Sequence, residues 1–303
     1  MMLGGTAPIL ILIALGFLSR ALGLLRAGDE RALNGFVYFF ALPAFLLLNL
    51  SRTSFTLESL KFMGAGLVPI AALLGAYFLI RRVGGGKELF YLLTTSTVFG
   101  SLAFFGVPYV EYVLGPGEPE RLAALIIAAV APPTVILVLT FLELYGIEGS
   151  LRKALGKVAV RLSRNPLIIA IALGASLSLA EVSLPRFLVQ SLSYLSSATA
   201  PVALFSLGVF LYGRSYRSFV PALGLSALRL LILPGITFLV AWTLGFSALE
   251  RDVLVFMNGT PIAVNMIVLS QRYRYHPELI GTVVFVSSLG SLLTLSLWRW
   301  ILS

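Results

Sequence analysis

The stretch that decides the fold is Met257-Asn258-Gly259-Thr260-Pro261-Ile262-Ala263-Val264-Asn265. It interrupts an apolar run, 249–271, that is long enough to span a membrane as one helix. Glycine and proline weaken a helix, and proline also removes a backbone donor. Backbone groups released in lipid must find other partners, so such an interruption survives only inside protein or beside a polar cavity. The stretch therefore predicts a broken membrane helix with its break at a functional site.

A second interrupted run lies in the first half of the chain, at Phe99-Gly100-Ser101-Leu102-Ala103-Phe104-Phe105-Gly106-Val107-Pro108. A helix that starts after a break directs its N-terminal N–H groups and positive dipole end toward the protein centre. Two breaks that cross there predict a substrate site for an anionic group. The expected site residues are Ser101, Phe105, Gly106, Pro108, Asn258, Thr260, Pro261 and Asn265. The alternative is a pair of proline-kinked packing helices without a ligand.

The remaining sequence is that of a membrane protein. The 303 residues are 58% hydrophobic and only 12% charged, about half the charged share of a typical soluble chain. Apolar runs of the length of a membrane helix predict ten spans and an all-α membrane fold. The expected spans are 5–25, 33–50, 61–81, 89–114, 121–143, 165–181, 187–212, 219–244, 249–271 and 278–302.

The basic residues predict how the chain is oriented. Of the 22 lysines and arginines, 15 fall in the odd-numbered loops or at the ends of the expected spans that flank them. Cytoplasmic loops of membrane proteins are enriched in these residues, so both termini are expected outside the cytoplasm, in a multi-pass plasma membrane protein. The net charge of +9 then reflects these loops and contact with lipid rather than a nucleic-acid partner.

An internal repeat indicates how the spans are organised. Ile13-Ala14-Leu15-Gly16 recurs as Ile171-Ala172-Leu173-Gly174, and Pro43 and Pro201 are separated by the same 158 positions. Five spans per copy is an odd number, so the copies must enter the membrane with opposite polarity, an arrangement found in secondary transporters. We expect a first repeat at 1–143, a basic cytoplasmic connector at 144–164 and a second repeat at 165–303. The connector is either an amphipathic helix on the inner leaflet or a solvated linker.

The charged residues narrow the possible chemistry. No aspartate or glutamate falls at the middle of an expected span, which argues against a central proton relay. Arg229 lies well inside a span, either as a counter-charge for an anion or, as the favoured interpretation, snorkelling to the interface. His276 is expected at the N-terminus of the last helix. The absence of cysteine, with one histidine in the chain, excludes a thiolate or histidine-rich metal site, and no enzyme-like cluster is visible.

Several motifs resemble the auxin efflux carrier family, in order along nearly the whole chain. They are Phe39-Phe40-Ala41-Leu42-Pro43-Ala44, Arg164-Asn165-Pro166-Leu167-Ile168, the run 200–208, and Gln271-Arg272-Tyr273 followed by His276-Pro277. The resemblance implies two inverted five-helix repeats, crossing broken helices four and nine, and a fold similar to the bile acid/sodium symporters. It also implies interleaved scaffold and transport domains, elevator-like movement and a homodimer.

The expected function is therefore a secondary active transporter or uniporter for a small organic anion. Gly106 and Pro108 fit the family's fourth-helix pattern, and Pro261 and Asn265 fit the ninth. Ser101 stands where the family usually has asparagine, which favours another carboxylate, such as a dicarboxylate, over auxin. No cofactor is expected, and the coupling ion could be Na⁺ or H⁺. The alternative function is a non-transporting sensor built on a carrier fold.

Overall fold

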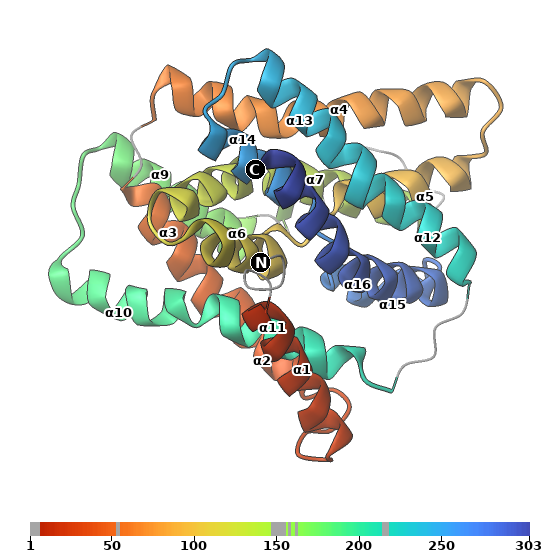
Figure 1. Ribbon diagram of the computed structural model, residues 1–303, viewed down its shortest axis with the longest axis horizontal. Coiled ribbons are helices and arrows are strands. Elements are labelled where there is room, and N and C mark those ends of the chain that lie inside the picture. Colours follow the sequence, from red (N-terminus) through yellow and green to blue (C-terminus); the bar gives the residue numbers. More distant parts are fainter. Residues whose placement is uncertain (1–6, 53–54, 147–155, 157–158, 161–162, 214–217) are drawn as a thin grey trace. The chain divides into compact units, whose positions relative to one another are not determined.

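Every regular element that the described residues form is helical (Figure 1). The computed structural model describes residues 7–52, 55–146, 156, 159–160, 163–213 and 218–303. The first half contains α1 (Ala7–Ala21), α2 (Glu30–Phe36), η1 (Val37–Ala41), α3 (Leu42–Ser51), α4 (Leu57–Arg82), α5 (Lys87–Val98), η2 (Leu102–Gly106), α6 (Val107–Leu114) and α7 (Glu118–Gly146). The second contains α9 (Pro166–Leu179), α10 (Arg186–Ser197), α11 (Thr199–Leu211), α12 (Phe219–Ala227), η3 (Leu228–Ile232), α13 (Leu233–Thr243), α14 (Ala248–Asn258), α15 (Asn265–Arg272) and α16 (Pro277–Leu302).

Several helical runs have the length and composition of membrane spans. Six meet both criteria within the described residues: Glu30–Ser51, Leu57–Arg82, Glu118–Leu142, Arg186–Leu211, Phe219–Thr243 and Pro277–Leu302. The segments Ile11–Ala21, Leu102–Leu114 and Pro166–Leu179 are apolar but shorter. The predicted all-helical fold is confirmed, whereas the count of ten spans and the inverted repeat stay predictions. The connector 144–164 falls largely outside the described residues, so its structure stays a prediction as well.

The chain divides into two compact units, and each draws on both halves of the sequence. Unit 1 comprises Met1–Lys61, Ala103–Ala128 and Ser163–Arg214. Unit 2 comprises Phe62–Leu102, Ala129–Leu162 and Ser215–Ser303. Helices α4 and α7 and the segment η2 contribute residues to both units.

Glycines bring helices of unit 1 into direct backbone contact. Helix α1 lies along α11, and α3 lies along α9 (Figure 1). A Cβ atom at Gly16 would overlap the carbonyl group of Phe205, and one at Gly208 would overlap that of Ile13. Small residues permit this close approach, which gives membrane helices their van der Waals contact in the absence of a hydrophobic driving force.

The π-helical turns η1, η2 and η3 each stand directly before a helix with proline at its second position, namely Pro43, Pro108 and Pro234. A proline has no N–H for the carbonyl four residues earlier, and its ring clashes with that carbonyl. The wider π turn accommodates the clash. In unit 2 the carbonyl four residues before Pro234 belongs to Leu230, and it accepts a hydrogen bond from Trp298 Nε1 at 3.1 Å.

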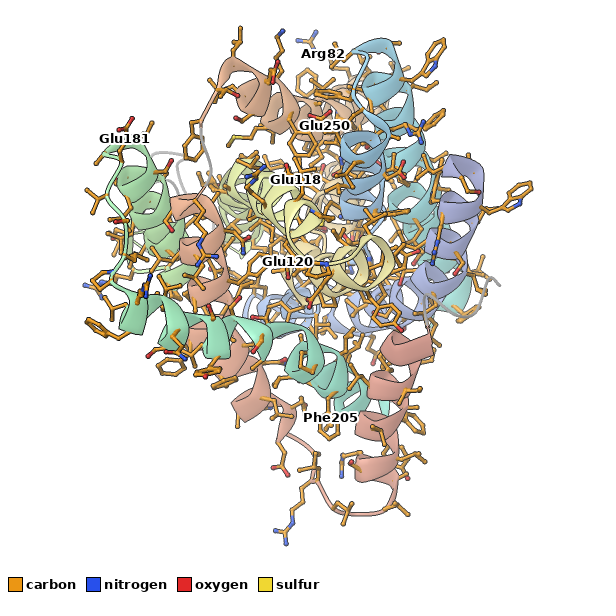
Figure 2. All side chains as sticks on the ribbon, turned by 60° about the vertical axis from the view of Figure 1, so that its left-hand side comes forward. Arg82, Glu118, Glu120, Glu181, Phe205 and Glu250 are labelled. Carbon is orange, nitrogen blue, oxygen red and sulfur yellow. The ribbon has the colours of Figure 1, made fainter. Side chains whose placement is uncertain are left out.

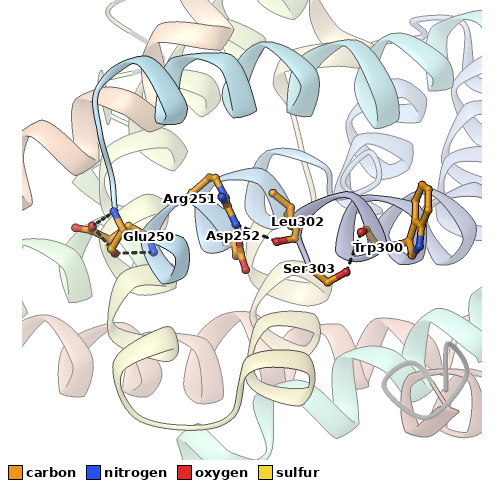
Figure 3. A network of polar contacts seen from close by, with 7 residues as sticks. Glu250, Arg251, Asp252, Trp300, Leu302 and Ser303 are labelled. Carbon is orange, nitrogen blue, oxygen red and sulfur yellow. Dashed lines mark hydrogen bonds and ion pairs between the residues drawn. The ribbon is translucent and has the colours of Figure 1, made fainter.

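Charged side chains gather at helix ends. Figure 2 shows Glu118, Glu120 and Glu250 in first turns, Arg82 at the end of α4 and Glu181 in the turn after α9. At the start of α14, the Ser247 side chain accepts from the Glu250 N–H, and the Glu250 carboxylate accepts from the Ser247 N–H (Figure 3). This capping box satisfies backbone donors that a helix N-terminus leaves open.

Two further polar contacts of unit 2 lie at opposite ends of α16. Arg251 pairs with Asp252 and donates to the carbonyl of Leu302, which ties α14 to the end of α16 (Figure 3). His276 stands at the N-cap of α16, as predicted, with its Nε2 atom 2.9 Å from Glu88 Oε1. Beside it, burial raises the pKa of Tyr275, so that this hydroxyl stays protonated.

Candidate functional site

Two helical runs in unit 2 are interrupted where the sequence places its glycine and proline residues. Helix α5 ends at Val98, and η2 begins at Leu102 after three residues outside a helix. Helix α14 ends at Asn258, and α15 begins at Asn265. The backbone groups of both interruptions have lost their helical partners, and many of the residues there are buried, so these groups must be satisfied within the protein.

The two interruptions satisfy each other. Gly100 and Ile262 form an antiparallel bridge. The N–H of Ser101 donates to the carbonyl of Pro261 at 2.8 Å, and the N–H of Ala263 donates to that of Phe99 at 2.9 Å. The Ile262 N–H donates to Ser287 Oγ of α16 at 3.2 Å. Segments far apart in the sequence are thus held side by side by backbone hydrogen bonds.

Arg229, the second residue of η3, lies beside this bridge and is 1% exposed. Its Nε donates to the Thr260 carbonyl at 2.8 Å and its Nη2 to Thr260 Oγ1 at 2.9 Å. Its Nη1 donates to the Thr97 carbonyl at 2.6 Å. The prediction that Arg229 snorkels to the interface is therefore wrong. Its side chain is held inside unit 2 because the carbonyls at the interruptions offer it the acceptors that lipid lacks.

Gly100 makes room for the guanidinium group. A Cβ atom at this position would overlap Arg229 Nη2 and crowd Cζ. The backbone of the first interruption therefore packs directly on the planar cation. The Thr97 hydroxyl is hydrogen-bonded to the Tyr77 hydroxyl at 2.8 Å, which fixes the last turn of α5 beside the same cation.

Asn258 is the last residue of α14, where the second interruption begins. Its side-chain amide donates to Thr237 Oγ1 at 3.0 Å and to the Gly66 carbonyl at 3.3 Å, just before Pro69 in α4. The residue is fully buried, and its Oδ1 atom has no hydrogen-bond partner among the described residues. An unpaired acceptor in a dry interior is costly, so its retention is typical of a functional position.

The eight predicted site residues fall into three groups. Ser101, Asn258, Thr260 and Pro261 all lie in unit 2. The contacts above connect Ser101, Thr260 and Pro261 to Arg229 or to the bridge, whereas the side chain of Asn258 bonds to Thr237 and to the carbonyl of Gly66. Phe105, Gly106 and Pro108 belong to unit 1, in η2 and the first turn of α6, and all are buried. Asn265 begins α15, but its side chain lies outside the described residues.

Sequence reasoning missed Thr97, Gly100 and Thr237, and it interpreted Arg229 incorrectly. A signal for the first was present, because Thr94-Thr95-Ser96-Thr97 is an unusually polar run directly before a break, and all four residues are buried. After the second break, fewer backbone N–H groups are free than the sequence predicts. Met266 N–H donates to the Ala263 carbonyl, and Ile267 N–H donates to the Val264 carbonyl.

The electrostatics of the bridge are those of a single buried cation. Arg229 forms no ion pair with any carboxylate in the part of the chain that the structure describes, and its acceptors there are the neutral oxygens of Thr97 and Thr260. A buried charge without a counter-ion is costly. An arrangement that keeps a full positive charge buried in the protein is therefore suited to balance a negative charge that arrives with a ligand.

Comparisons with known proteins agree with a carrier. The sequence profile of a family described as "Membrane transport protein" matches residues 2–151 and 147–299. An "Uncharacterized transporter" of Methanocaldococcus jannaschii is 28% identical over 97% of this chain and 96% of its own. A "Putative malonate transporter" of Rhizobium meliloti is 26% identical over 97% and 93%. The "Auxin efflux carrier component 1" of Arabidopsis thaliana is 25% identical over 44% of this chain and 22% of its own.

Proposed function

This chain belongs to the membrane transport protein family, and from that premise we propose that it is a secondary carrier of a small organic anion. It would release its substrate unchanged, as an active transporter or a uniporter. One observation carries the proposal: the paired interruptions of unit 2 enclose a guanidinium group, that of Arg229, whose described partners are uncharged. A broken-helix site with a fixed positive charge suits a carboxylate.

The substrate class follows from charge and size. Serine at position 101 replaces the asparagine expected for auxin, while a relative of nearly the same length is named for malonate. We therefore place small mono- and dicarboxylates ahead of auxin. The proposed contacts are those of the predicted site, of which Ser101, Asn258, Thr260 and Pro261 lie together in unit 2.

The proposed architecture is ten spans in two inverted five-helix repeats, with the interrupted helices crossing. Unit 1 supports the repeat. Gly174 packs on Leu47 of α3, since a Cβ there would lie 3.1 Å from the Leu47 carbonyl oxygen. Gly16 packs on Phe205 of α11 in the same way. Gly16 and Gly174 are 158 positions apart, and so are Leu47 and Phe205. If two repeats are related by a two-fold axis, each contact between them occurs twice, with the two residues exchanged between the repeats. The contacts Gly16–Phe205 and Leu47–Gly174 form such a pair.

The proposed mechanism is of the elevator type. Unit 2, which holds both interruptions, would carry the substrate as one body, and unit 1 would serve as the scaffold and as the dimer contact. The proposed location is the plasma membrane with both termini outside the cytoplasm, as the distribution of lysine and arginine favours.

Transport into proteoliposomes tests the proposal. Purified protein should give saturable uptake of at least one labelled carboxylate from a panel of malonate, succinate, lactate and indole acetate, and Arg229→Gln should abolish it. Empty vesicles and the exposed-site variant Arg299→Gln serve as controls. Absence of saturable uptake for the whole panel would contradict a carrier. A carboxylate that raises the melting temperature without any uptake would instead identify a sensor.

A further inference from the structure

Arg229 lies at the depth where a carrier holds its substrate. It is the eleventh residue of the helical run Phe219–Thr243, so about 15 Å of helix separate it from one end. That distance is about half of the hydrocarbon thickness. The π-helical turn around it widens the helix at this point, before Pro234.

Two of the three acceptors of Arg229 are backbone carbonyls where helices stop at the interruptions, and the third is the Thr260 hydroxyl. Thr97 is the last residue but one of α5, and Thr260 follows α14 by two residues. The last carbonyls of a helix have no N–H partner, and they form the negative end of its dipole. In transporters with broken helices, such carbonyl ends are the groups that coordinate Na⁺. In this chain the guanidinium group occupies them.

The space beside these carbonyls is filled as well. Gly100 lies so close to Nη2 that even a methyl group would not fit. Three of the five guanidinium N–H groups have described acceptors, and they contact both interruptions at once. A Na⁺ ion at the same oxygens would have to displace the guanidinium group and would lie next to a like charge.

Resting on the proposed function, we propose that Arg229 is a built-in cation that replaces a coupling Na⁺ at the paired interruptions. It holds the two carbonyl ends together and supplies the charge that balances one carboxylate. With a monocarboxylate bound, Arg229 and the substrate then carry no net charge, so charge balance needs no second ion. Transport consequently does not require Na⁺, and removal of the Arg229 side chain leaves oxygen acceptors that a free cation can fill.

The first test uses thermal stability and does not depend on knowing the substrate. The melting temperature of the purified protein should be the same in NaCl and in choline chloride at equal ionic strength. Arg229→Ala should melt at a lower temperature, and Na⁺ or millimolar guanidinium should restore part of the loss. Arg299→Ala, which removes an exposed arginine of the same unit, should show neither effect. Stabilisation of the unmodified protein by Na⁺, or an Arg229→Ala variant that responds to neither cation, would overturn the inference.

The second test uses carboxylate uptake. Uptake by the unmodified protein should be equal with Na⁺ and with choline on both sides, and Arg229→Ala should reduce it at least about tenfold. Arg229→Lys keeps the charge but loses the planar fork, so it should retain more uptake than Arg229→Ala. Uptake that requires Na⁺ overturns the inference and leaves the carrier proposal intact. Absence of any uptake defeats the carrier proposal, while the melting temperatures still decide the role of Arg229.

Discussion

Unit 1 and unit 2 differ in the kind of side chain that each buries. Among the described residues, buried polar or charged side chains number three in unit 1 (Glu30, Thr199 and Ser206) and seventeen in unit 2. Unit 1 instead achieves its contacts with glycines that let helix backbones touch. Polar groups at membrane depth are costly, so they persist where they act. The difference indicates that packing dominates in unit 1 and chemistry in unit 2, and the following substitutions test that division.

The largest effect is expected at Gly100. Gly100→Ala forces the guanidinium group of Arg229 away from the paired interruptions. We expect carboxylate uptake to fall by about 100-fold, because small displacements within a site have effects of this size. Uptake by reconstituted protein checks it. Gly75→Ala, on α4 of the same unit with open space around it, should leave uptake unchanged. Equal uptake by both variants would show that the contact at Gly100 does not position the site.

In unit 1, Gly208→Ala should act on stability instead. The added methyl group would overlap the Ile13 carbonyl and push α11 away from α1. We expect the free energy of unfolding to fall by about 1–3 kcal/mol, the usual effect of overpacking. Denaturation in detergent measures it, with Gly35→Ala as the control because nothing lies near that position. The KM for uptake should not change, and a large change in KM would remove the proposed distinction between the units.

A smaller loss is expected at Asn258. Asn258→Leu removes the hydrogen bonds to Thr237 and to the carbonyl of Gly66. The free energy of unfolding should fall by about 1–2 kcal/mol, because the Gly66 carbonyl and the Thr237 hydroxyl lose a buried partner. Thr237→Val removes one of the same bonds, so the two losses should not add in the double variant. Full additivity would show that the contact is energetically unimportant.

The smallest effect is expected at Trp298. Trp298→Phe removes the donor to the Leu230 carbonyl, at a cost of about 1 kcal/mol. Pro234→Ala returns a backbone N–H to the position that serves this carbonyl in an ordinary helix. In that background the Trp298→Phe loss should shrink, as measured by unfolding of the four proteins of the cycle. An unchanged loss would show that Trp298 contributes through ring packing alone.

The sequence predicted the interruptions well because glycine and proline act locally. Gly100 and Pro261 mark the breaks without any knowledge of the fold, and proline also marks the positions of the π-helical turns. The helical class followed from composition. What a pattern of residues could not predict is which segments of different spans lie together. The bridge between Gly100 and Ile262 joins residues from opposite halves of the chain.

Arg229 shows most clearly what could not be predicted from the sequence alone. From sequence, an arginine about ten residues inside a span is usually explained by a long side chain that reaches the interface. The correct interpretation required knowing that two helices end beside it and leave carbonyl oxygens unpaired. Polar residues such as Thr97 and Asn258 could be noticed in the sequence, but their partners could not be identified.

The π-helical turn at Leu228–Ile232 has a consequence for the whole span that contains it. A π turn is equivalent to one residue inserted into an α-helix, so later side chains are shifted by about 100° relative to an uninterrupted count. Helix α12 before the turn packs on α16, and α13 after it packs on α14. The side chains of this span that face α16 before the turn therefore lie on a different side of the helix from those that face α14 after it. Deleting a single residue here would rotate the side chains of α13 by about 100° relative to those of α12, so that the two helices could no longer face α14 and α16 at once, although no contact residue would have been substituted.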